Sequence, residues 1–149
     1  MDAKDVMIGD LISCKSIKER FAKITEIYKQ LDYPFKQMVS LNANGLRYCV
    51  TIDEIEAIPL TEEILKANGF EDKSEKARYG SVFYGLLVGN VSITFEVDNG
   101  LPILTIEDTA DRSSQHNVIC LKDEIYNVHQ LQLALRLCGL NELADNFKV

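Results

Sequence analysis

The clearest constraint on the fold is the strict alternation of apolar and polar residues in VSITFEV, residues 91–97. Successive side chains of a strand point to opposite faces of a sheet, so this segment predicts a strand with one buried and one wet face. Such half-buried strands are typical of antiparallel sheets. The turn formers Gly89-Asn90 before the segment and Asp98 to Gly100 after it predict tight turns into neighbouring strands.

The first sixty residues carry the same kind of signal. In QMVSLNANGLRYCVTI, residues 37–52, two strand-like runs meet at Asn44-Gly45, a pair that tolerates positive φ and predicts a hairpin. In the earlier run RFAKITEIY, residues 20–28, the apolar residues break strict alternation, which predicts a bulge or a bend. Together these short strands predict a small antiparallel barrel of the SH3-like kind.

A short helix follows in IPLTEEILKANGF, residues 58–70. Thr61 is a good N-cap, and Gly69 can end the helix in the left-handed conformation. This ending would bring Phe70 against Leu65, the contact that accompanies a Schellman motif. The apolar side of the helix is thin, so we expect it to bridge two halves of the molecule. The polar segment EDKSEKA, residues 71–77, reads as a linker.

A second helix is predicted in VHQLQLALRLCGL, residues 128–140, with Asn127 as N-cap, Gln130 in the capping-box position and Gly139 as the stop. At about 100° per residue its apolar side chains cover roughly 220° of the circumference. The polar residues His129, Gln132 and Arg136 fall on the remaining strip. Such an apolar helix must be covered, either by the sheet and the final helix NELADNF or by a second subunit. It supplies the candidate interaction surface: Leu133, Leu137, His129, Gln132 and Arg136.

These patterns predict an α+β protein. The expected parts are a small β-barrel-like subdomain in residues 1–60, a bridging helix and linker in residues 61–77, and an antiparallel sheet packed by the C-terminal helices in residues 78–149. Each half alone has a small core, so we expect the halves to pack as one compact unit.

Charge and cysteine content limit the classes of function. The chain has 16 Lys and Arg against 23 Asp and Glu, a net charge of −7, which disfavours nucleic acid as a partner. Four cations keep that alternative open as a basic patch: Lys15, Lys18, Arg20 and Lys23. The 4 cysteines are widely spaced, without metal-ligand or disulfide patterns, and are expected to be buried free thiols.

The N-terminal residues lack the apolar core of a signal peptide, and no apolar run is long enough to span a membrane. We therefore expect a cytoplasmic protein without membrane contact.

No stretch carries a known catalytic motif, so we predict no catalytic residue, no metal and no cofactor. His129 lacks a partner at a useful helical spacing, which favours a structural role. The acidic loop from Glu107 to His116 could offer oxygen ligands to a cation, although loop acids are usually just solvated. We expect a non-enzymatic binding protein acting through a protein partner or a second copy. The alternative is a small-molecule binder or small enzyme with a pocket formed by Tyr79, Tyr84, His129 and Arg136.

Three segments resemble, in the same order, a family of small uncharacterised proteins of gut Bacteroides-type bacteria and their phages and prophages. They are IGDLI (residues 8–12), IPLTEEILKANGF (residues 58–70) and YNVHQLQLALRLCGL (residues 126–140). The family pattern is IGD, then IPLTEEIL…NGF, then YVHELQ…L…G. In this chain Asn127 stands between Tyr126 and Val128, where the family pattern runs from Tyr directly into Val-His, and Gln130 replaces Glu. The resemblance implies a bacterial cytoplasm and a mobile-element context, and in that context we expect the binding protein to act as a modulator of a host component. It implies no activity.

Overall fold

The computed structural model describes residues 6–18, 21–30, 36–76, 81–98, 100–110, 118–122 and 124–149. The chain divides into two compact units. Unit 1 comprises residues 1–59, 127–147 and 149, and unit 2 comprises residues 60–126 and 148. Both are built largely from antiparallel strands and carry helices, which confirms the α+β prediction. No helix in the described ranges is long and apolar enough to cross a membrane.

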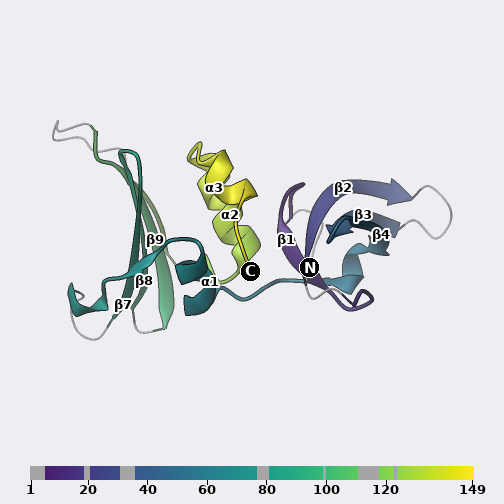
Figure 1. Cartoon of the computed structure of the whole chain (residues 1–149), viewed down its shortest axis with the longest axis horizontal. Coiled ribbons are helices and arrows are strands. Elements are labelled where there is room, and N and C mark those ends of the chain that lie inside the picture. The colour runs from purple at the N-terminus through teal and green to yellow at the C-terminus, as the bar shows by residue number, and fades with distance from the viewer. Residues whose placement is uncertain are drawn as a thin grey trace. The chain divides into compact units, whose positions relative to one another are not determined.

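Unit 1 begins with a five-stranded antiparallel sheet in the order β4-β3-β2-β1-β5, which curls on itself in Figure 1. Its elements are β1 (Leu11–Cys14), β2 (Ala22–Gln30), β3 (Lys36–Ala43), β4 (Leu46–Thr51), the 3₁₀ turn η2 (Ile52–Glu54) and β5 (Ile55–Glu56). The concave side holds a cluster of buried apolar residues that includes Ile12, Ile24, Val39 and Leu41. The curl therefore gives this small sheet a core of its own.

Local signals in unit 1 are confirmed. Asn44 and Gly45 join β3 to β4 with φ of 51° and 83°, the left-handed pair that a tight hairpin needs. The register of β2 against β3 shifts between Ile24 and Glu26, which is the predicted bulge. The η2 turn is held by Glu54, whose carboxylate accepts hydrogen bonds from Thr51 N and Oγ1, each at 3.1 Å. Hydrogen bonds from the Ser16 side chain and the Thr51 backbone lower the pKa of Glu54.

The C-terminal helices α2 (Val128–Leu137) and α3 (Asn141–Asp145) also belong to unit 1. The sequence grouped them instead with the second sheet, in residues 78–149. The chain returns to unit 1 beside the segment that leaves it: Pro59 bridges Asn127, and Val128 N donates to Ile58 O at 2.9 Å. Contacts between residues this far apart in sequence leave no local pattern, so periodicity could not assign the helices.

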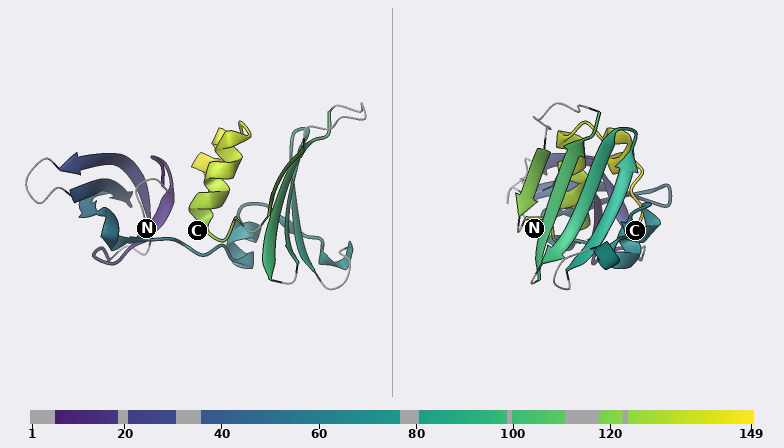
Figure 2. Two further views of the ribbon diagram at one scale, coloured as in Figure 1. Left: turned by 180° about the vertical axis from the view of Figure 1, so that it is seen from behind. Right: turned by 90° about the vertical axis from the view of Figure 1, so that its left-hand side faces the viewer.

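Unit 2 is a five-stranded antiparallel sheet in the order β10-β9-β8-β7-β6, with one short helix. Its long strands lie side by side in the right-hand view of Figure 2. The elements are α1 (Glu62–Ala67), β6 (Glu71–Asp72), the 3₁₀ turn η3 (Ser74–Lys76), β7 (Val82–Val88), β8 (Val91–Asp98), β9 (Leu101–Asp108) and β10 (Val118–Lys122). Ile93 and Phe95 of β8 are buried while Ser92 and Thr94 are part-exposed, as the alternation in residues 91–97 predicts.

The segment predicted as a linker has regular structure in residues 71–76. Glu71 and Asp72 pair with β7 opposite Gly85 and Tyr84. Lys73 N donates to Phe83 O at 2.8 Å, and Ser74 Oγ accepts from Phe83 N at 3.0 Å. Polar composition suggested a linker because the pairing partners lie about ten residues further along and do not show in the segment itself.

Both predicted helix endings are present. At the end of α1, Gly69 N donates to Lys66 O and Phe70 N to Leu65 O. At the end of α2, Leu140 N donates to Leu135 O at 2.9 Å, next to Gly139 with φ of 77°. These are Schellman motifs, and both rely on residues within one turn of the glycine.

Candidate functional site

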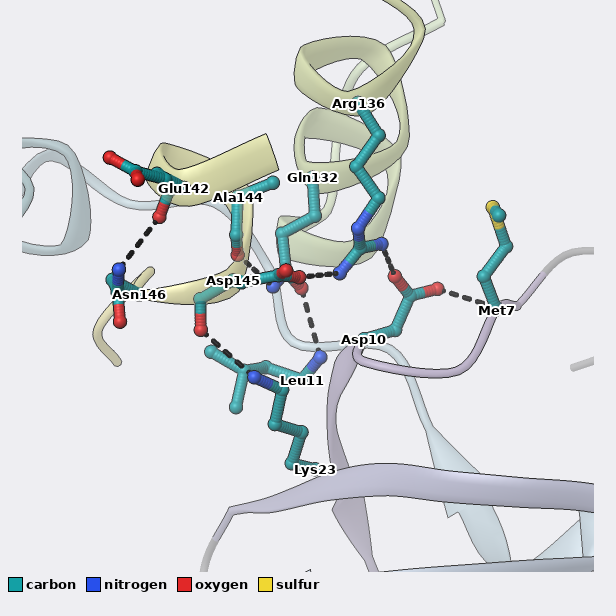
Figure 3. Close-up of polar contacts among 10 residues, drawn as sticks. All are labelled: Met7, Asp10, Leu11, Lys23, Gln132, Arg136, Glu142, Ala144, Asp145 and Asn146. Carbon is teal, nitrogen blue, oxygen red and sulfur yellow. Dashed lines mark hydrogen bonds and ion pairs between the residues drawn. The ribbon is translucent and has the colours of Figure 1, made fainter. Parts of the chain in front are cut away.

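Helix α2 is joined to the segment that leads into β1 by a buried ion pair (Figure 3). Arg136 Nη1 lies 2.5 Å from Asp10 Oδ1, with only 12% and 1% of the two side chains exposed. The second Asp10 oxygen accepts from Met7 N at 2.8 Å, and Arg136 Nη2 also reaches Asp145 Oδ1 at 3.1 Å. A Cβ on Gly9 would lie 2.8 Å from Arg136 Nη2, so the glycine makes room for the guanidinium.

Gln132, one turn before Arg136, joins three parts of unit 1. Its Oε1 accepts from Leu11 N of β1 at 2.9 Å, and its Nε2 donates to Ala144 O of α3 at 2.7 Å. Its side chain has no exposed surface. Figure 3 shows this amide between the two helices and the first strand. The glutamine therefore completes the backbone hydrogen bonding of β1 and α3.

On the polar strip of α2, Gln132 contacts β1 and Arg136 contacts Asp10 just before it. Gln132 and His129 of this strip are buried, and the Gln132 side chain accepts from Leu11 N, which lies 121 residues earlier in the chain. Of the candidate interaction surface, Leu137 is 76% exposed and Leu133 is part-exposed. The other three residues, His129, Gln132 and Arg136, are largely covered within unit 1, so they do not share an exposed face with the two leucines.

A pocket of about 590 Å³ lies in unit 1 where the end of β1, the η2–β5 segment and the start of α2 meet. Strand pairing of β1 with β5 and the Pro59–Asn127 bridge bring these three segments together. The apolar part of the wall comes from Ile55 and Ala57. The polar groups that line it are Lys15, Asp53, Glu56, Asn127, His129 and Gln130.

The pocket lining holds more acidic than basic side chains. Lys15 Nζ lies 3.0 Å from Glu56 Oε1, and both side chains are more than half exposed, so water screens this pair. Asp53 adds a second, exposed carboxylate. At the helix start, Gln130 Oε1 accepts from Asn127 N and Nδ2 at 3.0 and 3.1 Å in the predicted capping box. His129 is 5% exposed and is one of the residues that line the pocket.

Sequence reasoning identified His129 and Lys15 in other candidate sites but did not bring them together. The predicted ligand pocket is not assembled within either unit: Tyr84 is buried in unit 2, His129 and Arg136 belong to unit 1, and Tyr79 lies outside the described residues. Asp53 and Glu56 were missed because they are ordinary surface acids in a one-dimensional pattern. The pairing of β1 with β5 places Glu56 beside Lys15, and Asp53 lines the same pocket.

The predicted basic patch is partly engaged with acceptors of its own unit. Lys15 pairs with Glu56, and Lys23 Nζ donates to Asp145 O at 2.9 Å. Lys18 is exposed, and Arg20 lies outside the described residues. These contacts leave less positive charge for a phosphate backbone than the sequence suggests.

The four cysteines are free thiols, but only Cys14 is buried. The prediction of four buried thiols is wrong for Cys49 and Cys120, which lie on water-facing rows of β4 and β10, and Cys138 is part-exposed. Hydrogen bonds from Tyr28 and then Ser40, together with the charge of Arg47, lower the pKa of the Cys49 thiol. Burial raises the pKa of Cys138.

Cys49 is expected to be alkylated at lower pH than Cys138, because a lowered pKa yields the nucleophilic thiolate earlier in a titration. Iodoacetamide labelling at a series of pH values, read for each cysteine by peptide mass spectrometry, measures both profiles. Tyr28→Phe should move the Cys49 profile to higher pH and leave that of Cys138 in place. Coincident profiles for the two thiols in the unmodified protein would contradict the assignment.

Part of the acidic loop is outside the described residues, including Asp111 and His116. Within the described ranges, no three His, Cys, Asp or Glu side chains gather closely enough to hold a metal ion. No protein-family model matches this chain, and no curated protein or solved structure matches it either.

Proposed function

We propose that the protein is a non-enzymatic binding protein and that the pocket of unit 1 is its ligand site. The observation that carries this proposal is the pocket itself: about 590 Å³, lined by six polar residues and a short apolar wall. Its volume falls within the range of small-molecule sites, and a few convergent polar groups are what such sites use for orientation. The partner of this protein is then a molecule or side chain small enough to enter the pocket.

We further propose that unit 1 is an SH3-like barrel extended by two helices. Support comes from the strand order β4-β3-β2-β1-β5 and from the 3₁₀ turn before the short last strand. Five strands of this kind form a small, rigid scaffold, which suits a site built at the junction of a strand, a turn and a helix start. The bound group would meet preformed walls, so little ordering would oppose binding.

The resemblance to phage and prophage proteins supports a setting in the bacterial cytoplasm, with a host component as the source of the ligand. The segments that carry the resemblance include the residues that build this region. Asp10 follows Gly9 in IGD, Ile58 leads out of unit 1, and His129 lines the pocket, whereas the neighbouring lining residues Asn127 and Gln130 are where this chain departs from the family pattern. The same segments hold the fold together, so the resemblance supports the scaffold as much as the site.

The proposal is tested by fragment screening with amide chemical shifts as the readout. We expect fragments whose binding shifts amides near Lys15, residues 53–57 and residues 127–130. Ala57→Leu should weaken those fragments by about tenfold or more, because the larger side chain fills space on the pocket wall.

Leu137→Ala is the matched control, since Leu137 is 76% exposed on the same unit and does not line the pocket. Fragment binding by this variant should equal that of the unmodified protein. A library that yields hits elsewhere on the chain but none at these amides would refute the proposed function.

A further inference from the structure

We infer that the group bound by this pocket is an organic cation, a guanidinium or a primary ammonium. The inference rests on the proposed function, since it names the chemistry of the ligand for the same pocket. Its first basis is the charge of the pocket wall. The lining includes two carboxylate residues, Asp53 and Glu56, and one ammonium residue, Lys15. The ion pair of Lys15 with Glu56 leaves the carboxylate of Asp53 as the excess charge.

The helix start does not offer the usual alternative, an anion site. Backbone N–H groups at a helix N-terminus bind anions when they are open. Here Asn127 N donates to Gln130 Oε1, and Val128 N donates to Ile58 O at 2.9 Å. The capping box also engages the Gln130 N–H with the Asn127 side chain. An anion would therefore have to displace existing hydrogen bonds and would meet two carboxylates at close range.

Within the pocket, Lys15 is the cation that pairs with the Glu56 carboxylate. The Lys15 side chain is 60% exposed, so the ion pair with Glu56 is a weak one that a bound cation can replace. A planar guanidinium can bind a carboxylate through two parallel hydrogen bonds, which a single ammonium cannot do. The overall charge of −7 also attracts cations toward the protein before they reach the site.

The same chemistry can come from a free amine or from a basic side chain of a partner protein. The experiment therefore uses two probes, agmatine and a short peptide with one blocked arginine, each titrated by calorimetry and amide shifts. A peptide with citrulline in place of arginine is the matched neutral control, because it keeps the shape and loses the charge. Tighter binding of agmatine supports a free ligand, and tighter binding of the arginine peptide supports a partner side chain.

Charge variants make the test specific to the pocket. Asp53→Asn should weaken cation binding by about five- to tenfold, whereas Glu142→Gln should change it by less than about twofold. Glu142 is an exposed acid of α3 in the same unit and does not line the pocket, so it removes the same charge without touching the site. Lys15→Met should strengthen binding several-fold, because it removes the competitor for Glu56.

The outcomes separate this inference from the proposed function. Equal binding of the arginine and citrulline peptides, with shifts at the pocket amides, would overturn the cation assignment and leave the pocket as the ligand site. The cation assignment would also be overturned if fragments bind at the pocket amides and neither cation probe does. Loss of affinity from Glu142→Gln as large as from Asp53→Asn would also overturn it, because the attraction would then be general. Absence of any ligand at these amides would remove the proposed function itself.

Discussion

Replacing Arg136 with alanine is expected to lower the free energy of unfolding of unit 1 by about 3–5 kcal/mol. The reason is the environment of its partner: the Asp10 carboxylate is 1% exposed and would be left buried without a countercharge. The loss should be local at first. Hydrogen exchange followed by mass spectrometry should show lost protection in α2, in α3 and at the start of β1.

Lys66→Ala is the comparison variant for this prediction. Lys66 pairs with Glu62 on the exposed side of α1, with 48% of each side chain exposed, so its removal should cost less than about 1 kcal/mol. Adding Asp10→Asn to Arg136→Ala should recover part of the stability that Arg136→Ala loses, because it removes the uncompensated charge. A cost for Arg136→Ala as small as that for Lys66→Ala would show that the buried pair does not hold the helix.

Gln132→Leu is expected to destabilise unit 1 by about 2–5 kcal/mol, although leucine is apolar and of similar size. The substitution leaves Leu11 N–H without its acceptor and Ala144 C=O without its donor, both next to a side chain with no exposed surface. Each buried backbone group without a partner costs about 1–3 kcal/mol. Urea unfolding measures the loss of stability, and amide exchange at Leu11 measures the loss of its hydrogen bond.

Leu137→Ala on the same helix should change stability by less than about 0.5 kcal/mol, since its side chain is 76% exposed. The ordering of the two variants opposes what sequence hydropathy predicts, because the polar residue is the one that the interior requires. If Gln132→Leu proved neutral and the Leu11 amide stayed protected, the bridging role of the glutamine would be wrong.

The two predictions and the pocket depend on the same junction. Gln132 and Arg136 fix α2 against β1, and the first turn of α2 then supplies His129 and its neighbours to the pocket wall. A variant that releases the helix should therefore also weaken any ligand bound there. Binding measurements on pocket variants need the exchange profile of α2 as a check that the junction is intact.

The sequence by itself determined the local geometry of this protein. The Asn44-Gly45 hairpin, the bulge after Ile24, the Schellman endings at Gly69 and Gly139 and the cap at Asn127 are all as predicted. Each depends on residues a few positions apart, whose conformational preferences and hydrogen bonds act within one turn or one strand pair. The alternation in residues 91–97 likewise determined which side of β8 is buried.

Tertiary structure alone decided where the closing helices belong and which side of α2 is covered. Hydropathy predicts that a polar strip faces water, but Gln132 and Arg136 find their partners at Leu11 and Asp10, more than 120 positions away. The pocket has the same origin, since β-sheet pairing brings Lys15 beside Glu56, and the return of the chain adds His129. A buried polar group forms its hydrogen bonds with whichever donor or acceptor the fold places beside it. A hydropathy pattern along the sequence does not show which distant residue that will be.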